Sequence, residues 1–430
     1  MKLSRYSKIW PDGVDPDSVI LFSTGRASIV QVPKGRLSGI ETGNITADEH
    51  LILRELGLFV ERAENEKDGV GRFVDELNAG DHIFAAKVVM NLDCNLACRY
   101  CFEGLRKGKH YMTRRTADDF IGFLKNGLAP QVKEIRITFY GGEPLLSRDL
   151  VAYISLQIKT LADDRGLGYE AYLVTNGTLL TPRIVEELAG LGLKEAVVTI
   201  DGPRDIHDNC RPSKVGTGTF DLIFKNLRDV CGMTDIQVGG NYTRRNNADF
   251  PRLLDYMMEN GLTPDKLSLV RFDPVTQESE GLGPPGFHDG CRNYNEQWLR
   301  DAVVYLREEI LRRGYRTNRV VPMACMIDIR NRFVINYDGS ICKCPGLIGI
   351  EEYNIGNIVK GVEDYGNSHN LDNWKNEECL DCAYLPLCFG GCRYMKLVRD
   401  GSMDGVDCRR SYFDATLETM VKQDIKYGMV

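Results

Sequence analysis

Between residues 83 and 272 the apolar positions alternate between strand-like and helix-like patterns. Six short runs rich in apolar and β-branched residues predict buried strands at Ala86–Leu92, Glu134–Tyr140, Tyr169–Thr175, Ala196–Asp201, Asp235–Tyr242 and Lys266–Phe272. Apolar residues at helical spacing lie between them, for example at Thr116–Leu128, Ser147–Ala162 and Pro182–Leu191. Six βα units predict an α/β fold with a partial, TIM-like (β/α)6 barrel, whose chemistry is expected at the carboxyl ends of the strands.

The first 82 residues read as a smaller unit. Strand-like runs at Val19–Phe22 and Ser28–Val32 flank a turn, and Thr46 and Glu49 have the spacing of a helix capping box. A short apolar run, Leu58–Val60, and the charged run Glu61–Asp68 follow. This order predicts a winged-helix-like domain that binds a peptide along its edge strand. A purely structural N-terminal cap is the alternative.

The remaining chain divides at changes of composition. A Gly/Pro-rich segment at 281–286 ends the barrel pattern, and a predicted helix at Tyr294–Arg313 leads onward. From residue 323 the chain is rich in cysteine and turns, and a helix is expected at Arg409–Lys426. The predicted organisation is therefore 1–82, a peptide (leader) recognition domain; 83–285, the barrel; 286–322, a bridging helical region; and 323–430, a cysteine-rich domain.

Charge and cysteine content narrow the function. The 430 residues carry 54 Lys and Arg against 61 Asp and Glu, a net charge of −7, which gives no basic footprint for nucleic acid. The sequence contains no long apolar segment or apolar signal-peptide stretch, so we expect a cytoplasmic protein without membrane contact. In that compartment thiols are kept reduced. The 14 cysteines therefore indicate metal ligands rather than disulfides.

Three cysteines follow the first barrel strand on one short loop. Cys94, Cys98 and Cys101 can hold three corners of a cubane iron–sulfur cluster and leave the fourth iron open to a cofactor or substrate. A zinc site or free core thiols are the alternatives, but zinc sites favour Cys-x2-Cys pairs and a fourth protein ligand.

The spacing Cys94-x3-Cys98-x2-Cys101, with Tyr100 before the last cysteine, resembles the signature of the radical S-adenosylmethionine (SAM) enzymes. Residues after three further strands resemble other segments of that family, and the resemblance implies that they bind SAM: Gly141, Gly142, Glu143, Asn176, Thr199 and Asp201. In the family the glycine-rich segment and its carboxylate meet the amino group of SAM. The cluster donates one electron to SAM, and the resulting 5′-deoxyadenosyl radical abstracts a substrate hydrogen.

The resemblance leaves open whether Tyr140 and Arg211 contact the cofactor. Tyr140 stands where some relatives have a glutamine, so a side-chain contact with SAM there does not carry over. Arg211 lies in a segment that also resembles the family, and we weigh a contact with cofactor or substrate against a purely structural loop.

A second set of cysteines lies near the C-terminus. The spacing Cys379-x2-Cys382-x5-Cys388-x3-Cys392, together with Cys325, Cys344 and Cys408, resembles the SPASM pattern of radical SAM enzymes that modify peptides and proteins. It implies two auxiliary [4Fe–4S] clusters, one on Cys379, Cys382, Cys388 and Cys408 and one on Cys325, Cys344 and Cys392. The second has either an open iron or Cys342 as its fourth ligand. A zinc site remains the alternative for Cys379 to Cys392.

These features together predict a radical SAM/SPASM maturase that acts on a ribosomally made precursor peptide, of the geopeptide or sactipeptide type. The favoured reaction is a thioether bond between a cysteine sulfur and a carbon, with an electron supplied by a reductant such as flavodoxin or ferredoxin. The alternatives are carbon–carbon crosslinking, epimerisation and a formylglycine-generating sulfatase maturase. Pro345, directly after Cys344, counts against the sulfatase maturase, because the resemblance to that family would require a Cys-Asp pair with a catalytic aspartate at this place. A zinc-bound peptide-binding scaffold without catalysis is the non-enzymatic alternative.

Overall fold

The computed structural model describes residues 2–42, 44–60, 64–277, 279, 282 and 286–429. In these residues the largest element is a ten-stranded sheet with the order β11-β10-β9-β8-β7-β6-β12-β13-β14-β15. Six of its strands are parallel neighbours: β6 (Ile83–Asn91), β7 (Glu134–Gly141), β8 (Gly168–Thr175), β9 (Leu193–Thr199), β10 (Asp235–Tyr242) and β11 (Leu269–Pro274). All six predicted strands are confirmed, although β6 starts three residues earlier and β11 three residues later than expected.

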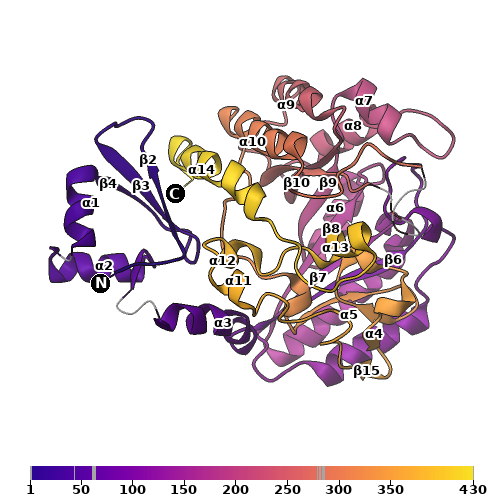
Figure 1. The fold of residues 1–430 in the computed structure, drawn as a ribbon. Coiled ribbons are helices and arrows are strands. Elements are labelled where there is room, and N and C mark those ends of the chain that lie inside the picture. The colour runs from indigo at the N-terminus through magenta and orange to yellow at the C-terminus, as the bar shows by residue number, and fades with distance from the viewer. Residues whose placement is uncertain are drawn as a thin grey trace.

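Helices connect these strands and cover one face of the sheet (Figure 1). They are α4 (Arg114–Gly127), α5 (Arg148–Arg165), α6 (Pro182–Gly190), α7 (Arg204–Cys210), α8 (Phe220–Val230), α9 (Phe250–Glu259) and α10 (Gln297–Arg312). The alternation of strand and helix confirms the predicted α/β class.

Alternate residues of each strand face opposite sides. Ile137 and Phe139 of β7 are buried in the core that the sheet shares with α4 and α5. Thr138 and Tyr140, between and after them, line a cavity on the other face. One side of the sheet is therefore the hydrophobic core, and the other side is available for chemistry.

The cysteine-rich region extends the same sheet instead of standing apart from it. Strand β12 (Arg332–Ile335) pairs in parallel with β6, and β13 (Ser340–Cys342), β14 (Gly356–Asn357) and β15 (Gly361–Val362) follow in antiparallel order. The sequence pattern missed this pairing because β12 is only four residues long. Helices α11 (Glu377–Leu380), α12 (Leu385–Cys388), α13 (Arg393–Asp400) and α14 (Arg410–Lys426) complete the region. The helices expected near Tyr294–Arg313 and Arg409–Lys426 are confirmed as α10 and α14.

The N-terminal residues form a three-stranded antiparallel sheet of β2 (Ser7–Pro11), β3 (Ser18–Ser23) and β4 (Ile29–Pro33). It packs against α1 (Lys34–Glu41) and α2 (Ala47–Glu55) through a small apolar core. The predicted hairpin is confirmed, and so is the capping box: Glu49 N–H donates to Thr46 Oγ1 at 3.2 Å and Thr46 N–H donates to Glu49 Oε2 at 2.8 Å. Strand β1 (Lys2–Leu3) pairs with β5 (Phe59–Val60), and α3 (Glu64–Ala79) leads to the barrel.

The N-terminal elements lie beside the C-terminal helices (Figure 1). Thr24 Oγ1 donates to the Ala383 carbonyl at 2.6 Å, and the Tyr6 hydroxyl donates to the Leu380 carbonyl at 2.8 Å. Apolar residues of β3 pack against α14 in one shared cluster. The winged-helix-like interpretation of this part stays a prediction. Residues 61–63 of the predicted charged run and most of the Gly/Pro-rich segment 281–286 lie outside the described residues.

None of the described helices combines the length and the apolar character needed to cross a lipid bilayer.

Candidate functional site

A cavity of about 550 Å³ opens at the carboxyl ends of the parallel strands. The loop after β6 carries Cys94, Cys98 and Cys101 into its wall. Backbone hydrogen bonds tie this loop to the segment after α7: Ala97 N–H donates to the Pro212 carbonyl at 2.8 Å, and Lys214 N–H donates to the Asn95 carbonyl at 3.0 Å. The structure thus brings the three predicted cluster thiols together at the expected edge of the sheet.

Burial raises the pKa of all three thiols, and their mutual repulsion contributes at Cys98 and Cys101. Lys107, which the sequence analysis did not single out, lies close enough to interact electrostatically with the three sulfurs. A cation beside several thiolates stabilises their ionised, metal-binding form.

The glycine segment after β7 is held against the loop that follows β6. Gly142 N–H donates to the Asn91 carbonyl at 3.0 Å, and Glu143 N–H donates to the Asp93 carbonyl at 2.8 Å. Gly141 has φ +129°, a region that favours glycine. Both glycines line the cavity, so their lack of side chains keeps this wall open.

Replacing Gly142 with alanine will impair assembly of the site. The added Cβ would lie 2.1 Å from the Asp93 carbonyl oxygen, a contact that requires the backbone beside Cys94 to move. We expect at least a tenfold loss of SAM affinity, measurable by equilibrium dialysis. The matched control is Gly122→Ala in α4, where an added Cβ meets nothing within 4 Å and which should add about 0.5–1 kcal/mol of stability. Unchanged affinity in the Gly142 variant would contradict the proposed role of this wall.

Glu143 lies outside the cavity wall and is fully buried. Its carboxylate accepts hydrogen bonds from Thr175 Oγ1 at 2.8 Å, from Asn176 N–H at 2.8 Å and from Leu145 N–H at 3.0 Å. The predicted contact of this carboxylate with the amino group of SAM stays a prediction. In the structure, the carboxylate holds the loop after β8, which presents Asn176 to the cavity.

Tyr100 and Asp201 form a buried polar network at the opposite wall. The Tyr100 hydroxyl donates to Asp201, and Arg211 Nη1 donates to the Tyr100 hydroxyl at 2.9 Å. Asn241 N–H donates to Asp201 at 2.7 Å. Asp201 is fully buried and fixes this network, while Tyr100, Arg211 and Thr199 line the cavity. Of the predicted SAM contacts, Glu143 and Asp201 support the wall and the others form it.

Several cavity residues were missed by the sequence analysis. Besides Lys107 they include Glu103, a residue that is 3% exposed and whose Oε2 has no hydrogen-bond partner among the described residues. Lys87, Thr138, Tyr172, Gln237 and Arg271 also line the cavity. Most of them lie on the cavity side of otherwise apolar strands. A polar residue at every second position of a buried strand could therefore have predicted these cavity residues from the sequence.

Four of the C-terminal cysteines line a second, smaller cavity. They are the predicted set Cys379, Cys382, Cys388 and Cys408. Cys379 lies in α11, Cys382 between α11 and α12, Cys388 at the end of α12, and Cys408 in the loop before α14. Asn376 caps α11 by accepting the Cys379 N–H at 3.0 Å, which fixes the first of the four. The structure therefore brings one complete predicted auxiliary set together.

The other predicted auxiliary set consists of Cys325, Cys344 and Cys392. Burial raises the pKa of the Cys344 thiol, and the neighbouring Cys392 and Cys325 raise it further. Cys342 adjoins this set: its side chain is fully buried in an apolar cluster with Val334 and Leu347, against which Cys344 also packs, and it too raises the pKa of Cys344. Its thiol donates to the Cys344 carbonyl at 3.5 Å. Because this thiol is directed at a backbone carbonyl, we expect three thiols with an open position rather than a fourth ligand from Cys342.

Changing Cys342 to alanine will therefore leave the iron content unchanged. Only a small buried thiol is lost, so the free energy of unfolding should fall by about 1 kcal/mol. In contrast, Cys344→Ala should lose about four irons per chain if it holds a [4Fe–4S] cluster. Iron and acid-labile sulfide analysis of the two purified variants makes the comparison. Equal losses of iron in both variants would show that Cys342 is a ligand.

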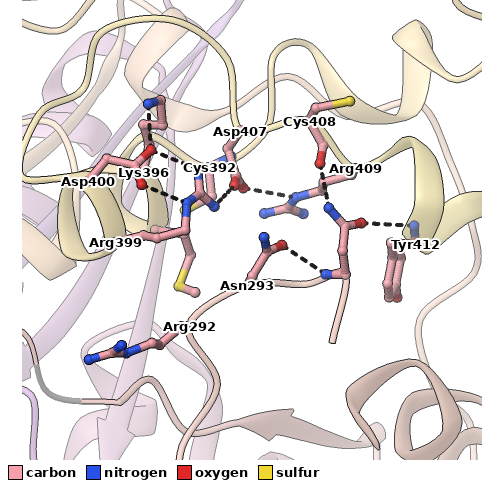
Figure 2. Close-up of polar contacts among 12 residues, drawn as sticks. Arg292, Asn293, Cys392, Lys396, Arg399, Asp400, Asp407, Cys408, Arg409 and Tyr412 are labelled. Atoms are coloured by element: carbon pink, nitrogen blue, oxygen red, sulfur yellow. Dashed lines mark hydrogen bonds and ion pairs between the residues drawn. The ribbon is translucent and has the colours of Figure 1, made fainter. Parts of the chain in front are cut away.

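Charged residues surround Cys392 of one auxiliary set and Cys408 of the other (Figure 2). Asp407 accepts from Arg399 Nη1 at 2.6 Å and from the Cys392 N–H at 3.3 Å. Arg409 lies 3.5 Å from Asp407, stacks 3.9 Å over the Tyr294 ring and interacts electrostatically with Cys392 and Cys388. A fixed guanidinium thus stands between one thiol of each set.

The donor sets have the chemistry of iron–sulfur ligands. Three thiols line the cavity at the strand ends and four line the second cavity. Cysteine thiolates are the ligands that hold iron–sulfur clusters in proteins. Among the described residues, no three His, Cys, Asp or Glu side chains are grouped closely enough to hold a single metal ion.

Comparison with known proteins decides the family. The family model of the Radical SAM superfamily matches residues 88–245. A serine-type anaerobic sulfatase-maturating enzyme of Bacteroides thetaiotaomicron is 32% identical over 347 residues, which cover 70% of this chain and 80% of that protein. The chain belongs to the radical SAM superfamily. Membership in the superfamily implies SAM and a [4Fe–4S] cluster.

Two further similarities extend over most of this radical SAM protein. The radical SAM cyclopropyl synthase TigE of Paramaledivibacter caminithermalis is 28% identical over 373 residues, 79% of this chain and 74% of that protein. The crystal structure of Streptococcus suis SuiB bound to precursor peptide SuiA has a TM-score of 0.56 and 16% identity, and the match covers 95% of this chain and 99% of that one. At that identity the second likeness concerns the fold alone.

Proposed function

We propose that this radical SAM protein modifies a ribosomally made precursor peptide and that its reaction is the formation of a thioether between a cysteine sulfur and a carbon. Similarity to a sulfatase-maturating enzyme and to SuiB, which was solved with a precursor peptide, supports a peptide substrate. With its [4Fe–4S] cluster on Cys94, Cys98 and Cys101, the protein would reduce SAM to obtain the 5′-deoxyadenosyl radical.

One observation carries the thioether proposal: the cavity that holds Cys94, Cys98 and Cys101 reaches Pro345, the residue next to Cys344. Tyr140 lies in the wall between them, and its phenol interacts electrostatically with both Cys101 and Cys344. An auxiliary cluster on Cys325, Cys344 and Cys392 would offer an open iron, a ligand position for a substrate thiolate. The 5′-deoxyadenosyl radical would take the hydrogen of the substrate C–H bond, the thiol would lose its proton, and the auxiliary cluster would accept the electron left over when the C–S bond forms. The substrate sulfur and the radical-forming site would then share one cavity.

The test uses the anaerobically reconstituted, reduced protein with SAM and a small cysteine-bearing peptide encoded beside its gene. Mass spectrometry before and after thiol alkylation reads the product. Loss of two hydrogens together with a thiol that no longer alkylates supports the thioether. Loss of two hydrogens with the thiol free indicates a carbon–carbon crosslink or an oxidation, and unchanged mass despite SAM turnover indicates epimerisation or another substrate.

Formylglycine formation is the second candidate, because the 32% identical relative is a sulfatase-maturating enzyme. Its product carries an aldehyde, which a hydrazine probe captures, whereas a thioether or a carbon–carbon crosslink has none. Pro345 beside the cavity favours the thioether, because no carboxylate follows Cys344 there to act as a base.

The proposal includes recognition of the peptide leader by the N-terminal sheet and helices. Leu51 and Ile52 on α2 expose 44% and 54% of their surface, which leaves an apolar patch beside the three-stranded sheet. The double variant Leu51→Ser, Ile52→Ser should weaken peptide binding by roughly tenfold, because burial of two apolar side chains is lost. Fluorescence anisotropy with the labelled precursor peptide measures this.

Leu156→Ser is the matched control, because Leu156 on α5 is 48% exposed but lies on the barrel. SAM cleavage without peptide should be the same in both variants. Substitutions are preferable to deletion of residues 1–82, since that segment packs against α14 and α12. Unchanged peptide affinity in the double variant would assign α2 a purely structural role.

A further inference from the structure

The lower part of the main cavity contains hydrogen-bond donors that the SAM site does not use. Lys87 of β6, Gln237 of β10 and Arg271 of β11 all line it. Their strands lie up to five positions apart in the sheet order, so the sheet must curve for these side chains to share one space. These three side chains are called the lumen donors below.

Two of the lumen donors have no side-chain partner among the described residues, and the third is only partly paired. Lys87 forms no hydrogen bond or ion pair with any residue that the structure describes, and Gln237, only 8% exposed, has no side-chain hydrogen bond among them. Arg271 pairs with Asp273 through Nε at 2.9 Å, which leaves its terminal amino groups available. Of the three, only Gln237 is buried, and the Arg271 side chain is 45% exposed. Polar groups that converge on one cavity with hydrogen-bonding capacity to spare are typical of a ligand site.

The positive charge of Lys87 and Arg271 indicates that the ligand is an anion. Burial lowers the pKa of Lys87, and Arg271 lowers it further by repulsion, whereas Cys344 raises it. An anion placed between the two cations would remove that repulsion and supply acceptors for the ammonium, amide and guanidinium groups. A carboxylate has two acceptor oxygens and the geometry that Arg binds bidentately.

Two of the three lumen donors lie below the predicted SAM site. Lys87 precedes the end of β6 at Asn91 by four residues, which places its Cα about 13 Å below the strand end at about 3.3 Å per residue. Gln237 is opposite Val197, two residues before Thr199 at the end of β9. Arg271 is level with Thr199, because both are paired with Gly239, so it connects the predicted SAM site with the deeper pair.

We propose that Lys87, Gln237 and Arg271 form a carboxylate-binding subsite in the barrel lumen, which anchors an acidic group of the substrate. The inference rests on the proposed function for the identity of the substrate as a peptide. The acidic group is either an Asp or Glu side chain or the C-terminal carboxylate of the peptide. Anchoring that group would position the neighbouring residue of the peptide below the radical-forming site.

The test measures binding of small probes to the reconstituted, SAM-loaded full-length protein by saturation-transfer NMR. N-acetylglutamate α-amide presents a side-chain carboxylate, N-acetylalanine presents an α-carboxylate, and N-acetylglutamine α-amide is the neutral control. We expect at least one carboxylate probe to bind about tenfold or more tightly than the neutral one. The stronger of the two carboxylate probes identifies the source of the anion.

Variants connect the binding to the lumen donors. Lys87→Met and Arg271→Gln should each weaken the bound carboxylate probe about tenfold or more, while Lys87→Arg, which keeps the charge, should retain most of the affinity. Lys133→Met, an exposed lysine just before β7, should bind like the unchanged protein. Thermal melting and iron content verify that each variant is folded.

Equal binding of the neutral and carboxylate probes would overturn the proposal, and so would unchanged affinity in folded Lys87→Met and Arg271→Gln variants. The probes need no peptide turnover, so the subsite stands or falls independently of the proposed reaction. If the probes bind as expected but no peptide is modified, the peptide assignment is wrong and the carboxylate subsite remains.

Discussion

Replacing Cys94, Cys98 and Cys101 together with alanine will reduce SAM cleavage below detection. The three thiols supply the cavity wall at the strand ends, and no other cysteine among the described residues lines that cavity. A three-thiolate site loses its cluster when all of its ligands are removed, and without the electron source SAM is not reduced. Chromatography of 5′-deoxyadenosine formed under dithionite measures the loss.

The same variant should keep its auxiliary iron. Because the C-terminal thiols lie in separate sets, the iron content should fall by about four per chain rather than to zero. The control is Cys231→Ala, which removes a thiol that donates to the Lys266 carbonyl, remote from all three sets. If the triple variant still produces 5′-deoxyadenosine, the assignment of the radical-forming cluster is wrong.

Replacing Asp328 with alanine will destabilise the chain by about 3–5 kcal/mol and release iron from the auxiliary set on Cys325, Cys344 and Cys392. Asp328 accepts from Arg393 at 2.7 and 3.0 Å, and the two side chains are 3% and 1% exposed. Removing one partner leaves an unpaired buried charge. Asp328 follows Cys325 by three residues and Arg393 directly follows Cys392, so the pair also links two predicted ligands.

A double variant distinguishes two causes of the lost stability: the loss of the ion pair itself and the burial of Arg393 without a partner. Asp328→Leu with Arg393→Met removes both charges and should recover most of the stability, because an apolar pair of similar volume often replaces a buried ion pair without loss. Urea titration gives the free energy of unfolding of each variant, and iron analysis gives the cluster content. A double variant no more stable than Asp328→Ala would contradict this explanation.

Local sequence patterns predicted the features of this protein that are determined by residues close together in the sequence. The cysteine loop, the glycine segment and the set Cys379, Cys382, Cys388 and Cys408 all depend on short spacings, and the structure brings each set together. The six parallel strands followed from runs long enough to show periodicity. The capping box at Thr46 was likewise visible within four residues.

Contacts between distant segments could not be predicted in this way. The carboxylate of Glu143 accepts a hydrogen bond from Thr175, at the end of β8 and 32 residues away, which no local pattern specifies. The side chain of Cys342 lies in an apolar cluster because it pairs with Val334 across two short strands. Lys87 and Arg271 face one another only because the sheet curves, and curvature arises from the assembled strands rather than from any one of them.

The pairing of β12 with β6 has a consequence for evolution and engineering. Grafting the cysteine-rich region of one such protein onto the barrel of another requires the two to share a strand register, because Val334 stands opposite Lys87. A chain cut before β12 would expose the backbone of β6 as an open edge, and open edges promote aggregation. The interchangeable unit in this architecture is therefore bounded by hydrogen-bonded strands rather than by linkers, and successful recombination should preserve β6, β12 and β13 as one block.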